Sequence, residues 1–205
     1  MWEFFKAGGP FMFFLVASSI VGLTYIIERA LALRHDKVIP AALETALENC
    51  REPGDLPSLE AACQANPSTL GRLLMVACTH LDDPREETIE LLQTRARQEV
   101  SKLERGLVML EIVVGIAPLL GLVGTIHGLI GMFGDLGKLG LGNNAELAKG
   151  ISIALNTTFM GLIVAIPSLT AWSFFNRRVE NLTVELENLC DKFIRQQYRF
   201  RARSK

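Results

Sequence analysis

The sequence predicts an all-α integral membrane protein with three transmembrane helices, the second and third extended into the cytoplasm beside a small cytoplasmic helical domain. Residues 112–134 and 150–176 are long apolar stretches that contain no Asp, Glu, Lys or Arg. A helix of about 20 residues crosses the roughly 30 Å core of a bilayer, so both stretches are long enough to span it. Charged residues make up 21% of the 205 positions and gather outside these stretches, which predicts a substantial portion outside the membrane.

A third apolar segment lies near the start of the chain, from Gly9 to about Ile27, and Glu28 and Arg29 follow it. A secretory signal peptide is the alternative interpretation. Such peptides carry positive charge before the apolar segment and a cleavage site of small residues after it. Because the order of charge is reversed here, we predict a retained membrane anchor.

The Lys and Arg residues that flank the spans predict the topology, because the flanks richer in these residues normally stay in the cytoplasm. The flank after the first span, the approach to the second and the tail after the third are basic, whereas the loop between the second and third spans has only Lys138 and Lys149. The resulting division is an external N-terminus (1–8), the first transmembrane helix with its cytoplasmic flank (9–34), a cytoplasmic helical domain (35–105), the second transmembrane helix (106–133), an external loop (134–149), the third transmembrane helix (150–176) and a cytoplasmic helical tail (177–205).

The cysteines agree with this topology. Cys50, Cys63, Cys78 and Cys190 all fall in segments predicted to be cytoplasmic, where thiols stay reduced. An even number of cysteines also permits two disulfides, but the spacing matches no disulfide framework.

Turn residues divide the first part of the cytoplasmic domain. Pro53-Gly54, Pro57 and Asn66-Pro67 predict short helices at about 40–51, 57–65 and 68–81.

A longer helix is predicted to begin at Asp83-Pro84. Asp83 suits its N-cap, Pro84 its first turn, and Glu86 and Glu87 its positive end. Apolar residues keep helical spacing from there to Leu107, and no residue is expected to break the helix before the second span.

The third span is predicted to continue as an amphipathic helix, in which Val179, Leu182, Leu186 and Phe193 keep helical spacing between charged residues. Such extensions require partners for their apolar faces. They either pack on each other within one subunit, or several copies form a helical ring, because about 70 residues of broken helices provide only a small core.

Polar side chains occur inside the predicted spans at Thr125, Asn156, Thr157 and Thr158, where polar groups are costly and usually have a purpose. A hydroxyl can donate to a carboxylate, accept from a carboxylic acid, or help to coordinate sodium. The alternative is that each threonine bonds the carbonyl four residues earlier in its own helix.

Small residues and prolines complete the second and third spans. Glycines permit close packing of membrane helices, and prolines bend a helix and free carbonyls that neighbours can satisfy. The candidates for packing or bending are Pro118, Gly121, Gly124, Gly128, Gly161 and Pro167, and Gly115 and Gly131 are further packing candidates.

Two segments carry a family resemblance. Residues 116–128 (IAPLLGLVGTIHG) resemble the second-span signature of the MotA/TolQ/ExbB family, and residues 150–167 (GISIALNTTFMGLIVAIP) resemble its third-span signature. Ile27-Glu28-Arg29, at the end of the first span, also fits. Three spans and a short chain favour the ExbB/TolQ branch over the four-span MotA branch.

The resemblance implies a stator subunit of an ion-driven motor: a ring, typically pentameric, around a dimer of a single-span partner similar to ExbD or TolR. The partner brings an aspartate into the membrane, and ion flow past it drives movement of ring against core. Thr125 and Thr158 match the family threonines that line the central pore near this carboxylate, and we expect Thr157 and Asn156, beside Thr158, to line the same ion pathway. The chain itself has no deep acid, since Glu28 and Glu111 fall near the cytoplasmic ends of the spans.

The sequence departs from the family pattern in two places. Ile153 stands where many members have a glutamate, and His127 where an apolar residue or tryptophan is usual. A histidine in the membrane is a candidate proton group. However, His127 points about 200° away from Thr125 on a helix of 3.6 residues per turn, so a neutral histidine at a helix contact near the outer side is favoured.

Several function classes are excluded by composition. The formal net charge of −1 gives no support for nucleic-acid binding, and no zinc-binding spacing, phosphate-binding loop or nucleophile motif occurs, so we expect no metal, no cofactor and no enzyme activity.

The predicted function is therefore a ring-forming, proton-driven stator subunit in the bacterial inner membrane, with its N-terminus outside and its C-terminus in the cytoplasm. A sodium-driven version is one alternative, because Ser152 and Asn156 add oxygens. A non-conducting scaffold of an envelope complex is the other.

Overall fold

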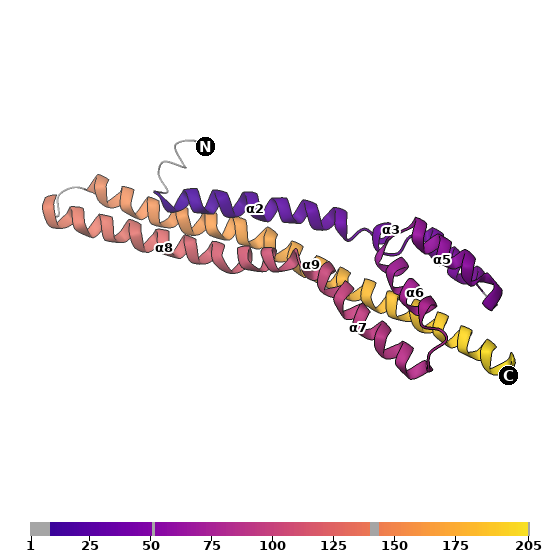
Figure 1. Cartoon of the computed structure of the whole chain (residues 1–205). Helices are drawn as coiled ribbons and strands as arrows, with labels where there is room; N and C mark the ends of the chain where they lie inside the picture. Colours follow the sequence, from indigo (N-terminus) through magenta and orange to yellow (C-terminus); the bar gives the residue numbers. More distant parts are fainter. Residues whose placement is uncertain (1–8, 51, 140–143, 205) are drawn as a thin grey trace. The chain divides into compact units, whose positions relative to one another are not determined.

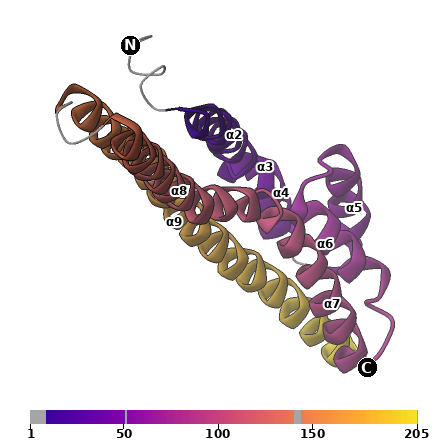
Figure 2. The same cartoon turned by 90° about the vertical axis from the view of Figure 1, so that its left-hand side faces the viewer.

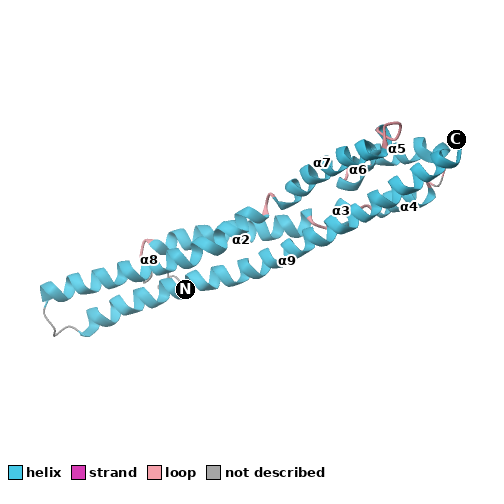
Figure 3. Ribbon diagram, turned by 90° about the horizontal axis from the view of Figure 1, so that it is seen from below, coloured by secondary structure: helices cyan, strands magenta, loops and turns pink. Residues whose placement is uncertain are grey.

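The computed structural model describes residues 9–50, 52–139 and 144–204, and within these ranges the chain is helical with short connections and contains no strand (Figures 1 and 3). Three helices are long and apolar enough to cross a membrane: Phe11–Ala32, Leu107–Gly134 and Ala148–Arg201. The predicted all-α class with three apolar spans is confirmed. The chain divides into unit 1 (Met1–Arg29 and Gly106–Phe174) and unit 2 (Ala30–Arg105 and Phe175–Lys205).

Unit 1 contains most of α2 (Phe11–Ala32), α8 (Leu107–Leu139) and the first part of α9 (Asn144–Ser204). The first part of α9 lies alongside α8 (Figures 1 and 2). The three helices share a small core of buried residues, namely Met12, Leu15, Val113, Ala117, Val164 and Ala165. Many large apolar side chains instead face outward, among them Phe13, Leu119 and Phe159, as expected of helices whose surroundings are lipid or other subunits.

Unit 2 contains the short helices and the later part of α9. The elements are α3 (His35–Val38), α4 (Ala41–Asn49), η1 (Pro53–Asp55), α5 (Leu56–Ala65), α6 (Thr69–Thr79) and α7 (Arg85–Glu104). The helices predicted at 40–51, 57–65 and 68–81 are confirmed to within two residues at each end. Helix α6 has a side-chain cap, because the Ser68 Oγ accepts a hydrogen bond from the Gly71 amide at 3.1 Å.

The core of unit 2 buries the apolar stripe of α9 against the short helices. Leu43, Leu59 and Leu74 are almost fully buried in this core, and α9 contributes Leu182 and Phe193. The four cysteines are free thiols buried in the same core. The amphipathic tail of α9 therefore finds a partner surface within its own chain.

The predicted start of α7 is wrong by one residue. Pro84, not Asp83, occupies the N-cap, and no side chain caps this helix. The Asp83 carboxylate instead lies 2.7 Å from the His80 Nδ1, so the preceding turn holds it. Glu86 and Glu87 lie in the first turn as expected.

The expectation of an unbroken helix from α7 into the second span is also wrong. Helix α7 ends at Glu104 and α8 begins at Leu107. At the break, the Arg29 side chain lies directly against Gly106, where a β-carbon would otherwise stand. Arg29 is almost buried and forms an ion pair with Glu28. Glycine favours a helix less than most residues, and here it also leaves room for the guanidinium group.

The predicted continuity of the third span is confirmed, because α9 is one helix of 61 residues. At 1.5 Å per residue it is about 90 Å long, roughly three times the apolar thickness of a bilayer.

Candidate functional site

A seam of close backbone contact joins α8 and α9 within unit 1. A β-carbon at Gly161 would lie 2.7 Å from the Ala117 carbonyl oxygen, and one at Gly121 would lie 3.0 Å from the Thr157 carbonyl oxygen. At Gly128 it would lie 3.1 Å from the Ala154 backbone nitrogen. Residues at intervals of three, four and seven share one face of a helix, so these glycines bring the two backbones together along a continuous line.

Thr125 of α8 and Thr158 of α9 meet at one edge of this seam. Their hydroxyls are in direct contact with each other. The Thr125 Oγ1 lies 3.1 Å from the Gly121 carbonyl oxygen and 3.0 Å from that of Ala154, and the Thr158 Oγ1 lies 3.3 Å from the Gly121 oxygen. Thr125 and Thr158, two of the four residues predicted for the ion pathway, thus form one cluster. Thr125 also makes the i−4 backbone contact named as the alternative.

Thr157 lies inside the seam. It is 0% exposed, and its hydroxyl lies 3.1 Å from the Ile153 carbonyl oxygen and 3.0 Å from that of Ala154. A β-carbon at Gly124 would approach the Thr157 Cβ to 2.7 Å. This burial places Thr157 at the contact between α8 and α9, and its expected place in the ion pathway stays a prediction.

Asn156 lies away from the threonine pair. Its Nδ2 is 3.4 Å from the Ser152 Oγ, one turn earlier on α9. Positions 156 and 158 are about 200° apart around the helix, so consecutive polar residues in the sequence serve different faces.

His127 lies at a contact between α8 and α2. Its ring centroid is 5.5 Å from that of Phe11, with an interplanar angle of 63°. This is a helix contact of the kind favoured for His127 in the sequence analysis.

The remaining proline and glycine candidates lie within α8 and α9 and differ in what surrounds them. Pro118 and Pro167 lie within α8 and α9, which continue past them. Gly115 and Gly131 face open space in the single chain, with no atom within 4 Å of an added β-carbon.

Gly150 is a seam residue that the sequence analysis missed. A β-carbon there would lie 2.6 Å from the Met132 Cβ. Its four-residue spacing from Ala154 was the available signal.

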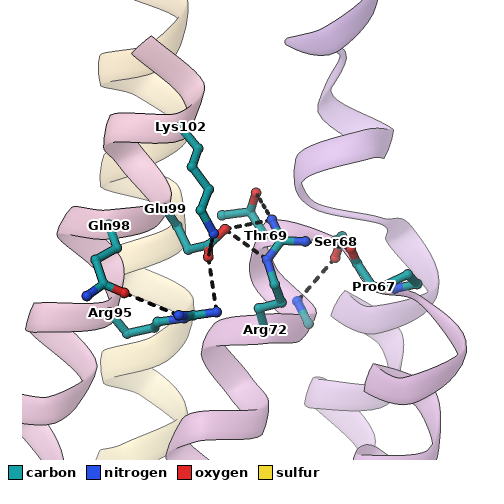
Figure 4. Close-up of polar contacts among 9 residues, drawn as sticks. Pro67, Ser68, Thr69, Arg72, Arg95, Gln98, Glu99 and Lys102 are labelled. Carbon is teal, nitrogen blue, oxygen red and sulfur yellow. Dashed lines mark hydrogen bonds and ion pairs between the residues drawn. The ribbon is translucent and has the colours of Figure 1, made fainter. Parts of the chain in front are cut away.

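Unit 2 contains an ionic cluster around Glu99 that the sequence analysis did not identify (Figure 4). The Glu99 side chain is 1% exposed. Arg72 of α6 donates to its Oε2 from Nε at 2.8 Å and from Nη2 at 2.6 Å, while Lys102 lies 2.7 Å and Arg95 3.4 Å from its Oε1. Burial by itself raises the pKa of Glu99, but the hydrogen bonds from Arg72 and Lys102 outweigh it and hold the pKa below its ordinary value. The spacing of Arg95, Glu99 and Lys102 on α7 was the only available signal.

Known proteins resemble this chain over most of its length. A profile of the MotA/TolQ/ExbB proton channel family matches residues 64–188. The putative biopolymer transport protein ExbB-like 1 of Synechocystis sp. is 38% identical over 82% of this chain and 66% of its own length. A putative ExbB homologue of Methanothermobacter thermautotrophicus is 29% identical over 90% of this chain and 66% of its own length. The Tol-Pal system protein TolQ of Pseudomonas aeruginosa is 28% identical over 89% of this chain and 84% of its own length.

The chain thus spans 66% of the length of the first two relatives. The family is one of channel and transport components and not an enzyme class, and the three apolar helices agree with a multi-pass membrane protein. Because the profile covers more than half of the chain, the protein belongs to the MotA/TolQ/ExbB proton channel family, in its ExbB/TolQ-like branch.

Proposed function

We propose that this chain is the ring-forming stator subunit of a proton-driven motor, and that Thr125 and Thr158 form its part of the proton pathway. The observation that carries the proposal is the hydroxyl pair, in which two side chains from different helices meet beside the Gly121 and Ala154 carbonyls. Hydroxyls can both donate and accept hydrogen bonds, so such a cluster suits a group that gains and loses a proton.

The titrating acid is supplied by a partner. The apolar stretches of the second and third spans contain no Asp or Glu, and Glu28 of α2 is committed to Arg29. We propose a dimer of a single-span protein of the ExbD/TolR kind, whose membrane aspartate faces the hydroxyl pair, with ion flow past it coupled to mechanical work on that partner.

The ring is proposed to be a homopentamer, and two features of the surface support assembly. Large apolar side chains of unit 1 remain exposed in the single chain. In unit 2, a groove of about 600 Å³ opens between α7 and α9, and its lining combines apolar residues such as Ala96 and Val100 with polar ones such as Gln93 and Glu187. Exposed apolar surface such as that of unit 1 marks contacts with other molecules, and the groove of unit 2 is large enough to receive side chains of a neighbouring subunit.

The proposed location is the bacterial inner membrane, with the N-terminus outside and both the 35–105 segment and the C-terminal tail in the cytoplasm. The distribution of Lys and Arg supports this orientation. Cysteine introduced at Ser58, an exposed position of α5, should be labelled by an impermeant thiol reagent only after the cells are opened, whereas cysteine at Asn143 should be labelled in intact cells.

Protons are favoured over sodium because each hydroxyl of the cluster already lies within hydrogen-bond distance of a carbonyl oxygen and of the other hydroxyl. Sodium requires several oxygens that converge on the ion and not on each other. A non-conducting scaffold remains the second candidate, and it predicts indifference to the loss of both hydroxyls.

The test is proton flux in vesicles that contain the complex purified from its native membranes through a tag on this chain. Valine at Thr125 or Thr158 keeps the side-chain shape and removes the hydroxyl, and leaving a buried polar partner unpaired costs about 1 to 3 kcal/mol. We expect about a tenfold or larger loss of flux with assembly unchanged.

The matched control is Thr170→Val. The Thr170 hydroxyl bonds the Ile166 carbonyl at 3.0 Å on an exposed face of α9, so its loss should leave flux unchanged. Normal flux in the Thr125→Val/Thr158→Val double variant would refute the proton pathway and favour the scaffold.

A further inference from the structure

We infer that Thr157, which is fully buried between α8 and α9, is a positioning residue that selects whether the Thr125–Thr158 pair presents a hydrogen-bond donor or only acceptors to the partner's acid. The inference rests on the proposed proton pathway. It is carried by the contact of the Thr157 hydroxyl with two carbonyls, one of which is also within reach of Thr125.

The carbonyls near the three hydroxyls have limited capacity. Each carbonyl oxygen has two lone pairs, and within an α-helix one of them accepts the backbone N–H four residues later. The carbonyls concerned belong to Gly121 on α8 and to Ile153 and Ala154 on α9. Three positions therefore remain for three hydroxyl protons.

In the first arrangement, Thr157 donates to the Ile153 oxygen at 3.1 Å. The Ala154 oxygen is then free for Thr125, at 3.0 Å, and the Gly121 oxygen is free for Thr158, at 3.3 Å. All three protons point inward. The pair then offers only lone pairs outward, which suits a protonated carboxyl group because that group supplies its own donor.

In the second arrangement, Thr157 donates to the Ala154 oxygen at 3.0 Å. Thr125 and Thr158 then share the single remaining position on Gly121. One of the two protons must go to the other hydroxyl or outward, where an ionised carboxylate can accept it. Rotation of hydroxyl groups alone converts one arrangement into the other, since the two Thr157 distances differ by only 0.1 Å as given above.

Gly124 leaves the room that Thr157 needs to adopt either arrangement. A β-carbon at position 124 would lie 2.8 Å from the Thr157 hydroxyl oxygen and 3.0 Å from its methyl carbon. Any larger residue would displace Thr157 from its position between the two carbonyls, so the glycine keeps both bonds within reach.

The experiment measures proton flux between pH 5.5 and 8.5 in vesicles that contain the purified complex, with Thr157→Val and Thr157→Ser compared. Without a hydroxyl at position 157, the Ala154 oxygen is always open to Thr125, so the pair stays with its protons inward and receives the carboxylate less well. The pH of half-maximal flux should rise by about 0.5 to 1 unit for valine, the size expected from one hydrogen bond. Serine restores the hydroxyl and should match the wild type.

A purely structural role would lower the amplitude of the flux and leave this pH unchanged, which would overturn the inference. Thr157→Ala, which also lacks the hydroxyl but is smaller, should shift the pH in the same direction and replaces valine if that variant does not assemble. Absence of wild-type flux, or normal flux in the Thr125→Val/Thr158→Val variant, would refute the proposed pathway itself and this inference with it. Loss of flux in that double variant without a pH shift for Thr157→Val would refute this inference alone.

Discussion

The two units of this chain differ in how their buried polar side chains are stabilised. In unit 1, the polar side chains at the helix seam are neutral hydroxyls that bond backbone carbonyls. In unit 2, a carboxylate is almost completely buried, but Arg72, Arg95 and Lys102 surround it. The first cluster holds no net charge, whereas the second depends on full charges in close contact.

The difference follows from the surroundings of each unit. A charge inside a bilayer has no water to return to, so it is costly there, whereas the cations around Glu99 are 37% to 58% exposed and keep part of their hydration. The packing differs too. Unit 1 joins α8 to α9 through glycines, and unit 2 buries large side chains such as Leu74 and Phe193. Stability should therefore respond to added volume in unit 1 and to lost charge in unit 2.

The largest expected effect comes from filling the seam with Gly161→Ala. The added methyl would lie 2.7 Å from the backbone oxygen of Ala117, which cannot move aside as a flexible side chain does. Overpacking of this kind costs about 1 to 3 kcal/mol. We expect a lower midpoint of thermal unfolding in detergent, followed by circular dichroism.

Gly115→Ala is the matched control for this variant, because α8, the helix that Gly161 of α9 packs against, leaves open space at position 115. Alanine favours a helix over glycine by roughly 0.5 to 1 kcal/mol, so the control should be as stable as the wild type or slightly more so. Equal midpoints for the two variants would show that α8 and α9 do not approach so closely.

A smaller effect is expected from Glu99→Gln, which keeps the shape of the side chain and removes its charge. Hydrogen bonds to charged groups contribute about 1.5 to 3 kcal/mol. Because the cations are partly exposed and can regain water, we expect a loss of roughly 1 to 2 kcal/mol in the free energy of unfolding. Glu104→Gln, at an exposed position of the same helix, should cost little.

The effect of Glu99→Gln should depend on pH. The pKa of Glu99 is lowered in the folded protein, so its contribution is fully present above the unfolded value of about 4.3 and is lost as pH falls through the folded pKa. Wild type and variant should thus differ at pH 7 and converge in acid. A difference that grew as the pH fell would contradict the ionised state of Glu99.

The smallest expected effect is that of a thiol reagent on the folded protein, because its cysteines are buried and should not react. Burial raises the pKa of Cys63 to about 11 and that of Cys78 and Cys190 to about 12, with nearby acidic groups adding to the effect. Maleimide at pH 7.5 should label these cysteines only after denaturation, because the thiolate is the reactive form. Rapid labelling of Cys63 in the folded protein would contradict the buried core of unit 2.

This burial changes how topology can be tested. The native cysteines cannot report which side of the membrane they occupy, since all four are buried in the core of unit 2. Introduced cysteines at exposed positions such as Ser58 are required instead.

Local pattern in the sequence determined the secondary structure. The length of the apolar stretches predicted three helices that can span a membrane, and prolines and glycines predicted the ends of α4, α5 and α6 to within two residues. The motifs around Thr125 and Thr158 led to the two hydroxyls that the structure brings into contact. Periodicity and turn propensity depend on neighbours along the chain, so the sequence contains them directly.

Only the tertiary structure decided which side chains meet across helices. It placed Thr157 inside the seam although its neighbour Thr158 lies at the edge, set Arg29 against Gly106 at the break between α7 and α8, and joined Arg72 to Glu99. These contacts depend on how each helix is rotated about its axis and on residues distant in the sequence. A rotation of about 100° separates consecutive residues, so a periodic pattern identifies an apolar face but does not determine which polar neighbour will be buried against another helix.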